Sequence, residues 1–325
     1  MVNVLRCLAV LGLLIVVGCG PDVPQVNVPK PDPPTGTKVT LGFNFSEGLS
    51  YEQTFYTKQI ITQTIQGKDQ VTEQSNGITM LFTVDSVKDD GATTISIVHT
   101  AVQIASKLPG KVAVHWNSQD GGKAPQLAIG LEALIGRGFK ILTNTKGENP
   151  KIIGANKMIE AMVAKLAVPL AAKAQLKLQL KSQFGEDAMA RNFKQAFAIH
   201  PTKPIDNGDS WSRQLKIEKG FPAVVNTTYT LLSREDGIAK AAINGTVTPN
   251  TDGPPLEIGP IKMKINLSGT QRGTLSFDEK SGLTLSSEIN QDMKGTLTML
   301  SSAGSSSPVP ITLKSLIKIT SKVVL

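Results

Sequence analysis

The stretch ITMLFTVDSVKDDGATTISIVHTAVQIA, residues 78–105, decides the fold class. Every second residue from Ile78 to Val84 is apolar, and most of the residues between them are polar. This period-two alternation is typical of a half-buried β-strand. The run Asp89-Asp90-Gly91 then supplies a turn before a second alternating segment begins. The stretch therefore predicts a β-hairpin with one apolar face.

The same pattern extends in both directions along the chain. Leu49–Gly67 predicts another long strand, and Trp211 begins a second β-rich half with turns at Glu235–Gly237 and Lys280–Gly282. The loop SSAGSSSP, residues 301–308, separates the last two strands. Strands of about 16 residues would be about 50 Å long, so we expect the sheet to twist and curve strongly.

A helical segment interrupts the strands between Lys157 and Phe197. Ala, Leu, Lys, Gln and Met dominate it, and β-branched residues are scarce. We predict two helices, the first interrupted at Pro169 or restarting there. Leu176, Leu178 and Leu180 alternate with polar residues as a strand would, but we predict helix at 175–183 because the residues are helix formers.

These elements predict an α+β fold: a mainly antiparallel, long, curved, half-barrel-like sheet with a central helical segment that covers one face. The domain would span residues 38–325, as a β half (38–154), a helical segment (155–198) and a second β half (199–325). A membrane barrel needs aromatic girdles and little helix, and only 5% of these residues are aromatic.

Similar hairpins in the two β halves suggest a duplication. TVDSVKDDGATTISI and TLLSREDGIAKAAI share a Ser, an acidic turn that ends in Asp-Gly, and an Ala soon after it. Acidic Asp-Gly turns are common, so chance similarity is the alternative.

The N-terminus has the layout of a signal peptide over residues 1–18. Its apolar run is too short for a membrane-spanning helix. The residues Val16, Val17, Gly18 and Cys19 resemble the lipobox of bacterial lipoproteins, which implies that Cys19 is acylated and becomes the new N-terminus. The alternative is an ordinary secretory signal that is cut elsewhere. Residues 19–37 hold six prolines and predict an extended linker.

Cys19 also bears on localisation and redox chemistry. Gly20, rather than Asp, follows it, and by resemblance to other lipoproteins this favours the outer membrane over the inner membrane. Cys19 would be the only cysteine of the mature chain, which excludes internal disulfides and thiolate metal sites there.

Charge and aromatic content restrict the class of partner. The formal net charge is +8, which is compatible with anionic lipid, polysaccharide or nucleic acid. The low aromatic content argues against a base-stacking surface, so we expect no nucleic-acid partner. Lys173, Lys177 and Lys181 would share one helix face. This lysine face can be interpreted either as a solvated face or as a surface that contacts anionic lipid headgroups.

The chain shows no pattern of catalytic chemistry. His99, His115 and His200 lack metal-ligand spacing and read as ordinary strand or loop residues, so we expect no metal and no cofactor. The run Asp206–Asp209 suggests a calcium loop, but a tight turn into a strand explains it better, with Trp211 as a core anchor. No nucleophile is paired with a base, and we expect no enzyme.

Three stretches carry a family resemblance: PTKPIDNGDSW (201–211), VTLGFNFSEGLSYEQTF (39–55) and GTLSFDEKSGLTLSSEI (273–289). They resemble a family of bacterial envelope proteins that is classed only as a domain of unknown function. In architecture alone, long curved strands with helices after a lipobox also resemble the half-barrel carriers of lipoproteins and lipids.

Two hypotheses about function follow. The first is a lipid-anchored, non-enzymatic envelope protein that binds a hydrophobic ligand between sheet and helices. The second is a packed β-sheet module that binds or scaffolds an envelope protein or a glycan. The presence of a ligand pocket would distinguish the two hypotheses. The sequence does not distinguish them, because apolar residues that line a pocket and those that fill a core follow the same alternation.

Overall fold

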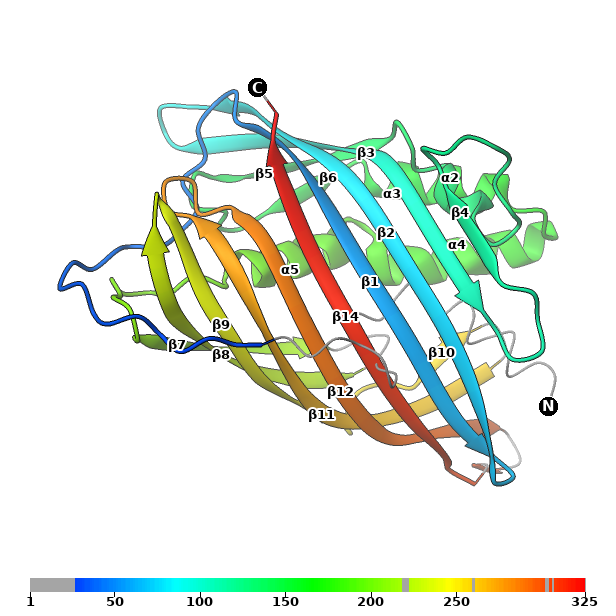
Figure 1. Cartoon of the computed structure of the whole chain (residues 1–325). Coiled ribbons are helices and arrows are strands. Elements are labelled where there is room, and N and C mark those ends of the chain that lie inside the picture. The colour runs from blue at the N-terminus through cyan, green and yellow to red at the C-terminus, as the bar shows by residue number, and fades with distance from the viewer. Residues whose placement is uncertain (1–26, 218–221, 259–260, 302–303, 306, 325) are drawn as a thin grey trace.

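One antiparallel sheet of 14 strands runs through most of the chain (Figure 1). The structure is a computed structural model that describes residues 27–217, 222–258, 261–301, 304–305 and 307–324. Neighbouring strands follow the order β6-β5-β3-β2-β1-β14-β12-β11-β9-β8-β7, while β4, β10 and β13 pair with β3, β11 and β12. The strands are β1 (Ser50–Ile65), β2 (Lys68–Val87), β3 (Ala92–Lys107), β4 (Val114–Asn117), β5 (Gly138–Asn144), β6 (Lys151–Ile153), β7 (Ser210–Ile217), β8 (Ala223–Glu235), β9 (Ile238–Pro249), β10 (Leu256–Ile258), β11 (Ile261–Asp278), β12 (Thr284–Ser301), β13 (Gly304–Ser305) and β14 (Val309–Val323).

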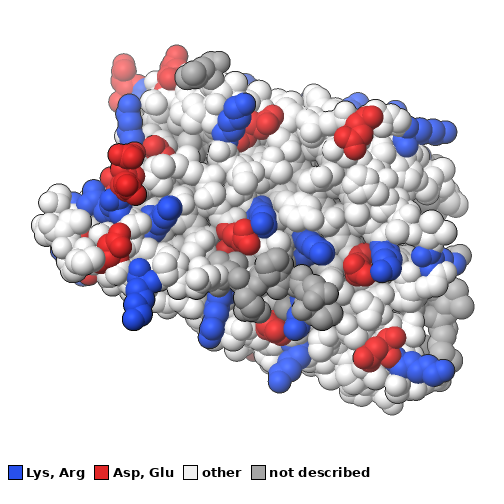
Figure 2. Space-filling model, in the orientation of Figure 1, with Lys and Arg blue, Asp and Glu red and all other residues white. Residues whose placement is uncertain are grey.

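The sheet is curved, and its two faces differ in chemistry. Figure 2 shows the convex face, over which charged side chains of both signs are scattered. Cross-strand pairs such as Lys318–Glu288 at 2.8 Å and Lys314–Asp292 at 3.6 Å lie on this side. The concave face carries the apolar side chains and the helices (Figure 1). The predicted mainly antiparallel, curved sheet with helices is therefore confirmed.

The helices cover part of the concave face. They are α2 (Ile129–Glu132), α3 (Ala155–Lys165), α4 (Leu170–Phe184) and α5 (Glu186–Phe197). Helix α3 contacts β5 and helix α5 contacts β6, whereas α4 packs against α3 and α5. Met158, Leu131 and the strand residues Ile97 and Phe139 share one core cluster in this part of the molecule.

The helical segment contains three helices where two were predicted. Pro169 ends the link between α3 and α4, as the sequence suggested, and Gly185 then separates α4 from α5 with an extended backbone. The choice of helix over strand at 175–183 is confirmed. None of the helices in the part of the chain that the structure describes has the length and hydropathy of a membrane span.

The two β halves repeat one arrangement of strands. The order β5-β3-β2-β1 recurs as β11-β9-β8-β7. The turn SEGLSY (46–51) leads into β1, and the turn DNGDSW (206–211) leads into β7. The N–H of Gly48 donates to the carbonyl of Val84 at 3.0 Å, just as the N–H of Gly208 donates to that of Leu231 at 2.8 Å.

Further contacts match between the halves. Ser50 Oγ lies 3.1 Å from Thr83 Oγ1, and Ser210 Oγ lies 2.8 Å from Thr230 Oγ1. The register of β2 against β3 shifts between Val84 and Ser86, and that of β8 against β9 shifts between Leu231 and Ser233. These equivalent bulges and turns support the duplication over chance similarity.

One predicted loop contains a strand. Gly304–Ser305, within the stretch expected to be a flexible loop, forms β13 by pairing with the end of β12. The predicted hairpin turns at Asp89–Gly91, Glu235–Gly237 and Lys280–Gly282 are confirmed by the pairs β2–β3, β8–β9 and β11–β12.

Candidate functional site

The concave face is divided into apolar regions of different construction. Helix residues complete the cluster around Ile97 and Phe139. A second cluster is built from strand residues alone, and we call it the strand-only cluster. Its buried members are Ile61, Ala223, Val247, Leu256, Met263, Ile265, Leu267, Met293, Leu297, Ile311 and Leu313.

A row of polar side chains borders the strand-only cluster. Strand register places these side chains directly opposite one another from β2 to β8, so all of them face the concave side. The polar belt, as we name it, consists of Gln74, Gln59, Ser315, Gln291, Gln271 and Thr227, with Gly245 between the last two. Each of the six side-chain positions is less than a tenth exposed.

Hydrogen bonds join members of the belt. Gln74 Nε2 donates to Gln59 Oε1 at 2.7 Å, and Gln291 Nε2 donates to Gln271 Oε1 at 3.1 Å. Gln271 Nε2 in turn donates to Thr227 Oγ1 at 2.7 Å, across the intervening strand β9. A Cβ at Gly245 would lie 2.8 Å from both Cγ and Nε2 of Gln271, so glycine is needed for this reach.

Ser315 is the middle member of the belt. It lies between Gln59 and Gln291, its relative exposure is 0%, and its Oγ has no hydrogen-bond partner among the described residues. A buried hydroxyl without a partner costs about 1–3 kcal/mol. Ser315 therefore presents a free donor at the centre of the concave face.

The geometry combines this donor with an apolar surface. Two residues along each strand from the belt, Ile61, Leu313 and Met293 point to the same face. They lie about 7 Å from their belt neighbours, since each strand residue rises about 3.3 Å. A molecule with an apolar chain and one polar group would match both parts.

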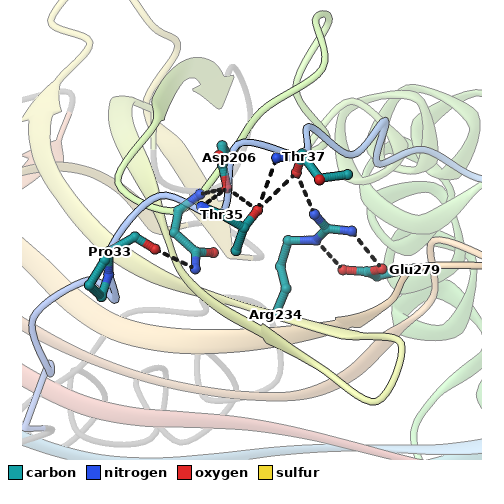
Figure 3. A network of polar contacts seen from close by, with 7 residues as sticks. Pro33, Thr35, Thr37, Asp206, Arg234 and Glu279 are labelled. Carbon is teal, nitrogen blue, oxygen red and sulfur yellow. Dashed lines mark hydrogen bonds and ion pairs between the residues drawn. The ribbon is translucent and has the colours of Figure 1, made fainter.

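The Asp206 turn has a structural role (Figure 3). Its carboxylate accepts hydrogen bonds from Thr35 Oγ1 at 2.9 Å, from the Gly36 N–H at 2.7 Å and from the Asn207 N–H at 2.8 Å. Hydrogen bonds from backbone N–H groups, that of Thr35 first, lower the pKa of Asp206 to about 2. Asp206 thus ties the end of the predicted linker to the start of β7.

Neighbouring contacts fasten the same segment. Asn207 Nδ2 donates to the Pro33 carbonyl, and Arg234 bridges the Thr37 carbonyl and the Glu279 carboxylate (Figure 3). Trp211 is buried and donates from Nε1 to the Ile199 carbonyl at 2.7 Å, which confirms it as a core anchor.

The histidines lie apart. His99 is in β3, where burial lowers its pKa and its Nδ1 lies 3.0 Å from the Arg137 carbonyl. His115 is in β4 and is exposed. His200 is packed between Phe43 and Phe277, and burial lowers its pKa to about 4. Within the described ranges, no three His, Cys, Asp or Glu residues gather closely enough to hold a metal ion.

The three candidate lysines share one side of α4, and that side is turned toward α3. Lys177 and Lys181 both pair with Glu160, at 2.8 and 3.2 Å. Lys173 Nζ donates to the Ala164 carbonyl at 2.9 Å. The lysine side of α4 remains solvated, since Lys177 and Lys181 are 41% and 32% exposed. The expectation that the opposite side of this helix covers the sheet is wrong, because α4 packs against α3 and α5.

The predicted lipidation site lies outside the described residues. Val16, Val17, Gly18 and Cys19 all fall within residues 1–26.

Sequence reasoning missed the polar belt. Its signal is a glutamine at an inward position of an alternating strand, as in Ile289-Asn290-Gln291-Asp292-Met293, where Gln291 shares the parity of its apolar neighbours. One such glutamine reads as an irregularity. Only strand register, which sequence alone does not provide, shows that four of them align.

Comparison with known proteins gives a family. A family model described as "Family of unknown function (DUF6263)" matches residues 90–284. No curated protein matches the chain.

Solved structures give weak likenesses. Lipovitellin, from a structure titled for its lipid–protein interactions, is 11% identical with a TM-score of 0.45, and the match covers 86% of this chain but 25% of lipovitellin. An outer membrane channel from Pseudomonas putida F1 is 8% identical (TM-score 0.24, covering 87% and 97%). The β domain of the Bordetella autotransporter BrkA is 9% identical (TM-score 0.21, covering 85% and 100%). These TM-scores are too low to establish a shared fold.

Proposed function

The chain belongs to a family of unknown function, DUF6263, and from this premise we propose that it binds an amphipathic ligand with an acyl-like chain on the concave face of its sheet. The chain of the ligand would lie on the strand-only cluster. Its polar group would accept a hydrogen bond from Ser315. The protein acts in this account by binding rather than by catalysis.

The single observation that carries the proposal is Ser315. Its hydroxyl is fully buried without a partner, at the border between the polar belt and the strand-only cluster. Buried polar groups are nearly always hydrogen-bonded, and an exception calls for an explanation. A ligand acceptor in this place would satisfy the donor.

The composition of the cluster supports a ligand with a flexible chain. Met263 and Met293 are both 1% exposed and face the concave side. Methionine side chains adapt their shape and are favoured at surfaces that accommodate varied apolar partners.

We further propose that the protein is anchored in the bacterial envelope, in the outer membrane, through an acylated Cys19. The proposal rests on the lipobox-like residues Val16–Cys19 and the proline-rich segment after them. Denaturing mass spectrometry of the protein from a bacterial envelope should find an acyl mass on Cys19. An unmodified Cys19, or cleavage at another residue, would contradict the anchor and leave the ligand site untouched.

A photoactivatable fatty acid with a diazirine near its chain end tests the ligand site. After illumination with the full chain, we expect labelled peptides from β11, β12 and β14 (residues 261–323). Excess unlabelled fatty acid should suppress this labelling. Labelling confined to α3–α5, or labelling that excess fatty acid does not reduce, would contradict the site.

A second candidate is the packed binding or scaffold module. The near-complete burial of the strand-only cluster favours it, because side chains such as Leu267 and Leu297 are 1% exposed without a ligand. In that case the convex face, with its cross-strand ion pairs, would meet the partner. The fatty acid would then give no saturable labelling anywhere in the chain.

A further inference from the structure

Helix α4 exposes to solvent an uncharged side that holds apolar residues together with Gln175 and Ser182. Leu170 and Leu178 are 84% and 72% exposed, and Val168 in the turn before the helix is 40% exposed. Ala171 and Ala174 lie on the same exposed side. A surface helix of a globular protein normally turns its apolar stripe to the core and its charges to water.

The lysines of α4 lie on the side toward α3, where Lys177 and Lys181 remain 41% and 32% exposed. Lys177 and Lys181 pair with Glu160 of α3, and Lys173 bonds to the Ala164 carbonyl at the end of α3. The folding of the chain itself therefore does not use the outer leucines. Exposed leucines beside lysine side chains can contact the interface of an anionic bilayer.

The charge of the surroundings fits an anionic partner. Helix α4 contains three lysines and no acidic residue, and residues 155–197 hold seven basic and three acidic residues. One of the three acids, Glu160, is already paired with two lysines. Lys165, exposed at the end of α3, lies beside the apolar turn at Val168. Lysine stems can extend from such a position toward headgroups.

A second apolar projection lies toward the same end of the molecule. The loop between β3 and β4 extends there beyond the end of β3 (Figure 1). It carries Val112, which is 90% exposed, beside Lys111.

We infer that the outer side of α4, formed by Val168, Leu170, Ala171, Ala174 and Leu178, docks onto an anionic lipid bilayer. The lysines on the neighbouring side of the helix contribute by charge, and the leucines make the contact. This inference is independent of ligand binding on the concave face. The experiment that tests it places a probe on α4 and not at the ligand site.

An environment-sensitive dye on Ala174→Cys tests the contact. The full chain carries Cys7→Ser and Cys19→Ser, so the dye reacts at one thiol. Vesicles of phosphatidylglycerol and phosphatidylcholine should shift the dye emission to the blue, and vesicles of phosphatidylcholine alone should do so more weakly. The same dye on Asp89→Cys, an exposed turn residue, should not respond.

A matched pair of double variants separates contact by α4 from general stickiness. Leu170→Gln with Leu178→Gln should raise the lipid concentration for half-maximal response about tenfold, because each leucine loses its apolar contact. Val71→Gln with Val323→Gln, which alters two exposed valines elsewhere, should leave it unchanged.

Three results would overturn the inference. The first is the absence of any vesicle response at Ala174→Cys. The second is an equal response at Asp89→Cys. The third is a blue shift without vesicles that grows with protein concentration, which would assign the face to a second copy of the chain.

Discussion

Ser315 and Ser321 form a natural comparison at the scale of single residues, because both lie on the concave side of β14. Ser321 Oγ accepts from Gln53 Nε2 at 2.8 Å and donates to the Thr284 carbonyl at 2.6 Å, whereas Ser315 Oγ has no partner among the described residues. Ser321→Ala should lower the free energy of unfolding by about 1–2 kcal/mol. Ser315→Ala should leave it unchanged or raise it by up to about 1 kcal/mol.

The same pair should differ in ligand binding. Ser315→Ala should weaken saturable binding of the fatty acid by about tenfold, as expected for one lost hydrogen bond. Urea denaturation and probe titration measure the two quantities. If Ser315→Ala is strongly destabilising while fatty-acid binding is unchanged, the hydroxyl has a structural role and the proposed site loses its central donor.

Gly245 leaves the space that Gln271 needs to reach Thr227 across β9. In Gly245→Ala the new Cβ would displace Gln271 from Thr227 and leave a buried amide without its partner. We expect the free energy of unfolding to fall by about 2–3 kcal/mol. Gly42→Ala is the control, since nothing lies within 4 Å of a Cβ there. Equal effects at the two positions would argue against the reach of Gln271 over Gly245.

His200 should make stability depend on pH. Burial between Phe43 and Phe277 lowers its folded pKa to about 4, so the unfolded chain binds the proton first as pH falls below about 6.5. Stability from this group is present above that pH and is lost progressively down to about pH 4. Between pH 7 and 5 the loss should be about 2 kcal/mol.

Histidine variants show which residue causes this dependence of stability on pH. His200→Phe should flatten the slope, and the part that remains should belong to His99, whose pKa burial also lowers. An unchanged slope in His200→Phe would contradict the account of this histidine.

At the scale of elements, the repeated turns before β1 and β7 make a paired prediction. Gly48 and Gly208 have φ of 81° and 87°, and each N–H bonds to the carbonyl at a bulge. Alanine at either position should cost about 1–2 kcal/mol, because left-handed backbone is unfavourable for residues with a Cβ. Thermal unfolding should give similar losses at both. A loss at one position alone would mean that the turns are not equivalent.

The elements also show where sequence was informative. Alternation predicted β3 and the second half of β2 because their inward residues are apolar, as at Phe82 and Val84. The first half of β2, from Lys68, was not predicted. Its inward residues include Thr72 and Gln74, so the apolar alternation is missing where the strand enters the polar belt.

The duplication was only partly visible in sequence. The acidic Asp-Gly turns suggested it, but SEGLSY and DNGDSW share only Gly, Ser and a following aromatic residue. Their equivalence lies in backbone hydrogen bonds to the bulges, which tolerate many side chains. The helices were predicted by composition, whereas the break at Gly185, where the backbone is extended, was not predicted.

In the whole molecule, we propose the concave face as the functional surface and the N-terminal segment as its attachment. Residues 32–37 are bound to the body through Leu232 and Asp206, so any tether begins before them. The sheet presents charged pairs on its convex face and the belt with the strand-only cluster on its concave face. The period-two alternation predicted one apolar face and one polar face. The border between polar and apolar residues on the concave face could be located only from the strand register.

Native mass spectrometry of the full chain is the measurement we would make first to test ligand binding on the concave face. The protein would be purified from a bacterial envelope in a detergent-free polymer and measured beside a denatured sample and the Ser315→Ala variant. We expect one additional mass of lipid size, absent after denaturation and reduced in the variant. A bare protein mass in both samples, with no uptake of added fatty acid, would contradict ligand binding on the concave face.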